Sequence, residues 1–198
     1  MVDIDSILQK FERFGVRLGL ESIQQLLAEL ENPHERVSIV HVAGSNGKGS
    51  VCAYLSAVLT EAGYRVGRYT SPHLVSWCER ICLNEQPITP DELENVLNQV
   101  ITAIPSGKPS PTQFEVITAA AWLYFAQQKV DIAVVEVGLG GRLDATNVCD
   151  RPPGQYHHLY QPGTLAAPWP HPGRHRQRKS WHLETGVSCR DWATSPRS

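Results

Sequence analysis

The sequence predicts an α/β fold in which a parallel sheet is flanked by helices. Three segments, 37–43, 65–70 and 131–137, are predicted to be strands; the first is rich in Val and Ile, and the third is a nearly continuous apolar run. Glycines or polar residues follow the strands directly, and helical patterns lie between the strands. Because the carboxyl ends of neighbouring parallel strands share one edge of a sheet, we expect the residues after these segments to form one site.

Apolar residues recur at helical spacing in five further segments, 3–14, 21–30, 51–62, 90–104 and 113–128. The fourth has the start signals of a helix, with Thr89 as N-cap, Pro90 in the first position and Glu92 three residues after the cap. The fifth is rich in Ala and apolar nearly all round, so we expect it to pack on the sheet.

The segment after the first strand has the composition of a phosphate-binding loop (P-loop). It reads Gly44-Ser45-Asn46-Gly47-Lys48-Gly49-Ser50. Glycines let consecutive N–H groups converge on an anion, and the N-terminus of the following helix adds partial positive charge. We expect these residues to bind a nucleotide, with Lys48 at its outer phosphates and Ser50 facing Mg²⁺. The alternative is a tight strand-to-helix turn with an exposed Lys.

The spacing of this loop differs from that of the usual P-loop. Two residues separate Gly44 from Gly47, where four are usual, and Gly49 takes the place of the Ser or Thr that normally follows the Lys. The strand before the loop and the helical pattern after it still supply the context that the motif requires.

Polar residues end the other two strands as well. Pro72 must leave the ladder, which puts Ser71 and His73 at the carboxyl end of the second strand, although a polar turn without chemistry is the alternative. Glu136 interrupts the third, apolar strand, and a carboxylate buried there is costly unless it is paired or bound to a metal. We expect Glu136 to hold Mg²⁺ or its water, with a salt bridge to Arg142 as the alternative.

Charge and composition argue against several classes of protein. The net charge of −2 gives no reason to expect nucleic acid or an anionic membrane as a partner. No apolar run approaches the roughly 18 residues that cross a bilayer, and the N-terminus lacks the features of a signal peptide. The five Cys are scattered without metal-ligand spacing. We therefore expect a soluble cytoplasmic protein, and we also expect it to be a monomer.

The composition changes near residue 151. Residues 152–198 contain seven of the 14 Pro and five of the eight His but only four Leu, Val or Ile residues. Such a segment buries too little apolar surface to offset its ordering entropy. We predict a domain at residues 1–151 and, at residues 152–198, an irregular or disordered tail without a packed structure. A basic binding arm at residues 174–179 is a weaker alternative.

Four segments, in order, resemble the folylpolyglutamate synthase/dihydrofolate synthase family of Mur-ligase-like, amide-forming ATPases. They are Phe14-Gly15 with Leu18-Gly19-Leu20, residues 43–50, residues 69–74 with Glu79-Arg80-Ile81, and residues 136–147. The unusual spacing of the P-loop is also the family's own. The resemblance covers residues 10–151 and implies the fold of the Mur ligase central domain, incomplete here.

The resemblance implies a ligase that activates a carboxylate with ATP and Mg²⁺ as an acyl phosphate, which the amine of L-glutamate then attacks. Folate or dihydropteroate would be the acceptor. Ser45, Asn46, Gly47 and Lys48 match ATP-binding positions, and Ser71 and Glu136 match magnesium positions. Segments that contact pterin or folate align with Leu18, Gly19, Leu20, Thr112, Leu143 and Asp144.

The glycine-rich segment 138–147 lacks the third glycine and the helix of a dinucleotide fingerprint. We expect it to form a loop at the carboxyl edge, with Arg142 and Asp144 as charges that face the substrate. Lys48, Glu136 and His73 are the candidate catalytic residues.

After residue 151 the chain departs from the family, which continues with a His ligand for a second magnesium, a carbamylated Lys and a C-terminal domain. A one-base insertion near the codons of Pro152-Pro153 would explain the departure. In the shifted frame Trp169, Trp181 and Trp192, each read with the residue after it, must encode Gly, as the family has there. We predict that the tail is out of frame, which the genomic DNA would refute by lacking the His and Lys codons.

The departure leaves two functional hypotheses. The first is an impaired ligase of this family, and the second is an ATP-binding fragment without catalysis.

Overall fold

The structure is a computed structural model that describes residues 4–11, 19–107, 109–148 and 157–161. All of these residues belong to one compact unit, Met1–Thr164. A second unit, Leu165–Ser198, lies outside the described residues. The tail predicted at residues 152–198 is therefore described only where residues 157–161 form a strand, and the boundary at residue 151 stays a prediction.

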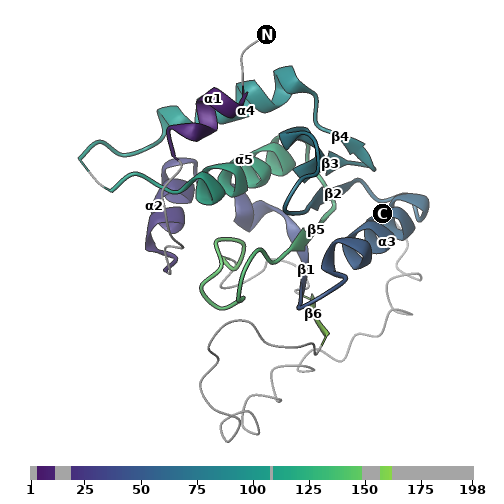
Figure 1. The fold of residues 1–198 in the computed structure, drawn as a ribbon. Helices are drawn as coiled ribbons and strands as arrows, with labels where there is room; N and C mark the ends of the chain where they lie inside the picture. The colour runs from purple at the N-terminus through teal and green to yellow at the C-terminus, as the bar shows by residue number, and fades with distance from the viewer. Residues whose placement is uncertain (1–3, 12–18, 108, 149–156, 162–198) are drawn as a thin grey trace, which may run out of the picture. The chain divides into compact units, whose positions relative to one another are not determined.

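A six-stranded sheet in the order β4-β3-β2-β5-β1-β6 forms the centre of the described part (Figure 1). Its strands are β1 (Ser38–Gly44), β2 (Val66–Tyr69), β3 (Ile81–Leu83), β4 (Gln86–Pro87), β5 (Ile132–Glu136) and β6 (His157–Gln161). The three strands expected from the sequence are β1, β2 and β5, and they adjoin in the order β2-β5-β1 with parallel pairing. The strand β6 pairs with β1, also in parallel.

The three predicted strands pair in parallel as expected, and two further strands that were not predicted make the sheet mixed. β3 pairs antiparallel with β2, and β4 pairs antiparallel with β3. The turn between β3 and β4 is Asn84-Glu85, and both residues have positive φ, 47° and 66°. Two left-handed residues match the right-handed twist of a tight hairpin, but Asn-Glu is a weaker signal for this turn than Asn-Gly. The hairpin was therefore missed in the sequence.

Five α-helices accompany the sheet within the described residues: α1 (Ile4–Gln9), α2 (Glu21–Glu29), α3 (Lys48–Glu61), α4 (Pro90–Thr102) and α5 (Gln113–Gln127). All five were expected, although α1 is shorter than predicted and α3 begins three residues earlier than residue 51. Two capping boxes, Thr89 with Glu92 and Thr112 with Glu115, start α4 and α5. No helix in the described ranges has both the length and the apolar character needed to cross a membrane.

The helices form two layers, with α5 on one face of the sheet and α3 on the other (Figure 1). Side chains alternate between these faces along each strand. Ile39 of β1, Tyr69 of β2 and Val135 of β5 belong to the core cluster that includes α5. Val42 of β1 and Glu136 of β5, which pair with each other, point to the opposite face, that of α3, where Glu136 lies next to Gly49.

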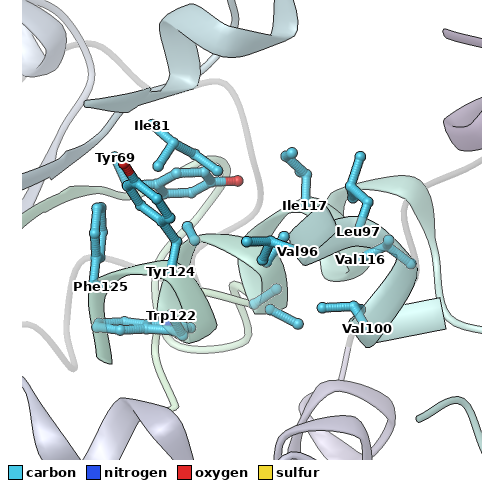
Figure 2. Packing of buried hydrophobic residues seen from close by; sticks show 14 of the residues in the cluster. Tyr69, Ile81, Val96, Leu97, Val100, Val116, Ile117, Trp122, Tyr124 and Phe125 are labelled. Carbon is cyan, nitrogen blue, oxygen red and sulfur yellow. The ribbon is translucent and has the colours of Figure 1, made fainter. Parts of the chain in front are cut away.

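The core between α5 and the sheet is closely packed. Figure 2 shows part of it, with the aromatic rings of Tyr69, Trp122, Tyr124 and Phe125 and the side chain of Ile81 on one side, and aliphatic side chains such as that of Val100 on the other. Tyr69 and Phe125 are almost completely buried, and the hydroxyl groups of Tyr69 and Thr118 form a hydrogen bond of 2.9 Å. This packing fixes β2, and with it the start of the segment that contains Ser71.

Candidate functional site

The carboxyl ends of β1, β5 and β2 bring three of the predicted segments together. Gly44 ends β1, Glu136 ends β5, and Ser71 follows β2 by two residues. Because β5 lies between β1 and β2, its terminal carboxylate stands between the P-loop and Ser71. The distance from Lys48 Nζ to Glu136 Oε1 is 4.0 Å, and the Ser71 N–H donates to Glu136 Oε2 at 3.1 Å.

The P-loop has the backbone shape that its glycines permit. Gly47 is the residue before α3 and has a φ of 74°, a left-handed conformation in which an L side chain is strained. No side chain caps the helix there, so the N–H groups of its first turn are available to an anion. Ser45, Asn46 and Ser50 are exposed to solvent.

Glu136 is the buried charge of this site. Glu136 is 6% exposed, and its carboxylate interacts with the Lys48 ammonium and the Ser71 N–H. Burial raises the pKa of the Glu136 carboxyl, and the interactions with Ser71 and Lys48 oppose the rise without cancelling it. The alternative of a salt bridge to Arg142 does not match the structure, because Glu136 faces Lys48 and the side chain of Arg142 is exposed.

The residues around Glu136 fit a hard divalent cation. A carboxylate has about four acceptor positions, and the hydrogen bond from Ser71 and the long contact with Lys48 leave this one undersatisfied. Among the described residues, no group of three or more His, Cys, Asp or Glu side chains could hold a metal without help. A single carboxylate that is completed by water and substrate phosphates is the usual arrangement for Mg²⁺.

We expect Glu136→Gln to raise the stability of the metal-free chain. The raised pKa means that the folded chain binds this proton more tightly than the unfolded chain does, so stability falls as the pH rises from about 4.5 through the raised value. The side chain of Gln does not ionise, so the E136Q chain does not lose stability in this way. Urea unfolding at several pH values should show a difference in free energy of unfolding that grows with pH across this window.

Addition of Mg²⁺ provides the control for the Glu136→Gln variant. If Glu136 binds the cation, Mg²⁺ stabilises the original chain more than it stabilises the E136Q chain. A variant that is as sensitive to pH and to Mg²⁺ as the original chain would contradict both the raised pKa and the metal role.

A second group of polar residues lies on the α5 side of the same edge. Asp144, only 5% exposed, accepts hydrogen bonds from the N–H of Leu139 at 2.7 Å and from the N–H of Thr146 at 3.0 Å. Its carboxylate therefore shapes the loop of residues 138–147 from within. Gly138 is needed there, because a Cβ atom on it would lie 2.6 Å from the ring of Phe114 and 3.0 Å from the carboxylate of Asp144.

The other residues that were expected to contact the substrate lie in three separate places in the fold. Arg142 and Leu143 are exposed on the loop of residues 138–147, as a substrate-facing role requires. The Thr112 hydroxyl takes part in the capping box of α5, in which it accepts from the N–H of Glu115 at 3.2 Å. Gly19 has a φ of 142° and directly precedes Leu20 at the start of α2. Leu18 lies outside the described residues.

His73 belongs to a separate cluster. Its Nδ1 atom accepts a hydrogen bond of 2.8 Å from Nε of Arg80, and its ring lies 4.5 Å from the ring of Trp77. Burial and the charge of Arg80 lower the pKa of His73, with Glu79 opposing them. Because Arg80 occupies the Nδ1 lone pair, only the Nε2 atom of His73 is left for the catalytic role expected of it.

Sequence reasoning missed two residues of this edge, His41 and Phe114. His41 lies inside the apolar strand β1 and is completely buried, and its Nε2 atom is 2.8 Å from Oγ1 of Thr146. A polar side chain within a buried strand is the same signal that identified Glu136. Phe114 gave no such signal, because an aromatic residue near the start of an apolar helix is ordinary core.

Comparisons with known proteins identify relatives both by sequence and by structure. No family model matches the chain. The dihydrofolate synthase/folylpolyglutamate synthase of Bacillus subtilis (strain 168) is 45% identical over 143 residues, which is 70% of this chain and 33% of that protein. The crystal structure of folylpolyglutamate synthase from Thermotoga maritima, at 47% identity, has a TM-score of 0.68 and covers 73% of this chain and 34% of that one.

A structure of the bifunctional folylpolyglutamate synthase/dihydrofolate synthase from Yersinia pestis, complexed with AMPPNP and Mn ion, is similar as well. It has a TM-score of 0.66 at 40% identity and covers 72% of this chain and 34% of that one. This chain therefore spans about one third of the length of the relatives that it matches. The N-terminal part of this chain belongs to the dihydrofolate synthase/folylpolyglutamate synthase family.

Proposed function

We propose that the described residues form the nucleotide- and folate-binding part of an ATP-dependent ligase that joins L-glutamate to folate or dihydropteroate. The observation that carries the proposal is the meeting of Lys48, Ser71 and Glu136 at one edge of the sheet. The level of identity to relatives with this activity in their names supports it.

ATP would bind with its phosphates at the start of α3. The N–H groups of the P-loop and the ammonium of Lys48 face that position, and they would stabilise the charge on the phosphates during transfer. Glu136 and Ser71 would hold a Mg²⁺ ion, which neutralises charge on the transferred phosphoryl group. The relative solved with AMPPNP and Mn ion supports a nucleotide and a divalent metal ion as the ligands. Ser50 is exposed in the first turn of α3, so its expected contact with Mg²⁺ stays a prediction.

The reaction would proceed in two steps. A carboxylate oxygen of the folate or dihydropteroate attacks the γ-phosphorus of ATP, which forms an acyl phosphate and releases ADP. The amine of glutamate then attacks the acyl carbon, and phosphate leaves as the amide bond forms. The chain's residues position the reacting groups and stabilise charge, which are the main sources of rate in phosphoryl transfer.

The acceptor would bind beside the loop of residues 138–147. Arg142 and Leu143 are exposed on this loop, and Asp144 holds its shape. Leu18, Gly19, Leu20 and Thr112 stay predicted contacts with the pterin or folate. We retain the monomeric state and the absence of nucleic-acid and membrane partners as proposals.

An ATP-binding fragment without catalysis is the second candidate, because the chain spans about one third of its relatives. Calorimetry of the 198-residue chain with AMPPNP and Mg²⁺, and a ligation assay with dihydropteroate, ATP and glutamate, separate the two candidates. We expect nucleotide binding together with a turnover far below that of an intact relative assayed in parallel. Absence of nucleotide binding would refute both candidates, and turnover equal to that of the relative would refute the impairment.

A further inference from the structure

A network of buried hydrogen bonds that starts at His41, in the middle of β1, is not part of the nucleotide site. Nε2 of His41 lies 2.8 Å from Oγ1 of Thr146, and the hydroxyl of Thr146 donates to Oδ1 of Asp144. His41 and Thr146 are completely buried, and Asp144 is 5% exposed. Three polar side chains in such a place are costly unless each has a partner, so their arrangement is specific rather than incidental packing.

The direction of these hydrogen bonds follows from a count of protons. The Asp144 carboxylate is the acceptor for the N–H groups of Leu139 and Thr146. The single proton of the Thr146 hydroxyl also goes to Asp144. The hydroxyl oxygen can then only accept from His41, so the imidazole carries a proton on Nε2. In this series of hydrogen bonds, His41 is therefore the first donor and Asp144 is the final acceptor.

These hydrogen bonds connect β1, the strand that leads into the P-loop, with the loop of residues 138–147. The two loops lie on opposite faces of the sheet. His41 pairs with Val135, and both side chains point to the α5 face, where Thr146 and Asp144 lie. The P-loop begins three residues after His41, and its Lys48 approaches Glu136 on the α3 face. β1 therefore carries both the phosphate loop and the anchor of the loop of residues 138–147.

We propose that His41 is a positioning residue: through Thr146 it holds the Asp144 carboxylate, and thereby keeps the loop of residues 138–147 in the shape that binds the acceptor substrate. The inference rests on the proposed function for the identity of that substrate, a folate or dihydropteroate. It does not rest on that function for the structural link, which can be measured without any ligand.

The test uses three versions of the 198-residue chain: the original, His41→Leu and His41→Gln. Leu has a similar volume but no donor. The amide nitrogen of Gln lies at about the reach of imidazole Nε2 and can donate to Thr146. Hydrogen exchange of the amides of Leu139 and Thr146 reports the shape of the loop, and the amide of Val134 in β5 reports the sheet.

We expect His41→Leu to speed exchange at Leu139 and Thr146 by at least about tenfold, with little change at Val134, because a lost buried hydrogen bond has an effect of this size. The affinity for dihydropteroate should fall by roughly tenfold, while the affinity for AMPPNP with Mg²⁺ changes by less than about twofold. His41→Gln should restore most of both losses.

Three results would overturn the inference. The first is that His41→Leu leaves exchange of the loop amides unchanged. The second is that the losses in His41→Gln are as large as those in His41→Leu. The third is that exchange at Val134 rises together with that of the loop, as a general loss of packing would require. Failure of the original chain to bind dihydropteroate would refute the proposed acceptor site. The exchange data and the Gln rescue would still decide the role of His41 in that case.

Discussion

Replacement of Lys48 with Ala is expected to weaken binding of AMPPNP with Mg²⁺ by roughly 100-fold, since a charged hydrogen bond contributes about 1.5–3 kcal/mol. Lys48 lies in the first turn of α3, and its side chain is 19% exposed. Its removal also takes away a positive charge that lies 4.0 Å from Glu136, so the net negative charge beside the phosphates increases. Both effects act in the same direction, so the loss should exceed that of a surface lysine.

Lys10→Ala is the matched control for this measurement. Lys10 is exposed just after α1, and the same change there removes the same charge from the chain. We expect its affinity to stay within about twofold of the original, because separated surface charges are screened at moderate salt. Calorimetry gives both affinities. Equal affinities for the Lys48 and Lys10 variants would defeat the assignment of the phosphate site.

Gly67→Ala is expected to destabilise the fold by about 1–3 kcal/mol, the usual cost of overpacking a close-packed core. A Cβ atom on Gly67 would lie 2.7 Å from two ring carbons of Phe125, closer than real Cβ contacts. Phe125 is completely buried within α5, so its ring has no free space into which to move. Urea unfolding of the two chains gives the difference directly.

A double-mutant cycle distinguishes this clash from a destabilisation by Ala in β2 that does not depend on Phe125. Phe125→Leu removes the ring carbons that Gly67→Ala meets, at a cost of its own. We expect the double variant to be more stable than the sum of the two single losses predicts, by at least about 0.5 kcal/mol. Strictly additive losses would contradict the contact. Because β2 leads to Ser71, the Gly67→Ala variant should also weaken nucleotide binding where it loosens that strand.

Much of the site could be predicted because each of its signals is local. A glycine turn between a strand and a helix identified the surroundings of Lys48, and one carboxylate in an apolar strand identified Glu136. The start of α4 was readable from Thr89 and Glu92, since a capping box involves residues only three apart. In these cases the physical cause and the sequence pattern lie in the same short segment.

The rest depended on contacts between distant residues. β5 pairs with β1 on one side and with β2 on the other, and the sequence of a single strand does not determine its pairing partners. Asp144 reads as a surface charge in a glycine-rich loop, yet backbone N–H groups and Thr146 surround it. His41 was overlooked because its partner is 105 residues away. The partner of a buried polar side chain is a property of the fold, so the sequence shows the need for one but not its identity.

The alternation of side chains at the end of β5 has a consequence for how this family can vary. Glu136 points towards α3, its predecessor Val135 points towards α5, and Gly138 lies against Phe114. Deletion of a single residue within β5 would reverse every one of these directions. The strand would still be apolar and could still pair, but a valine would face the phosphates and the carboxylate would enter the core. A substitution between apolar residues of similar size in this strand is therefore expected to disturb the site less than a change of its length.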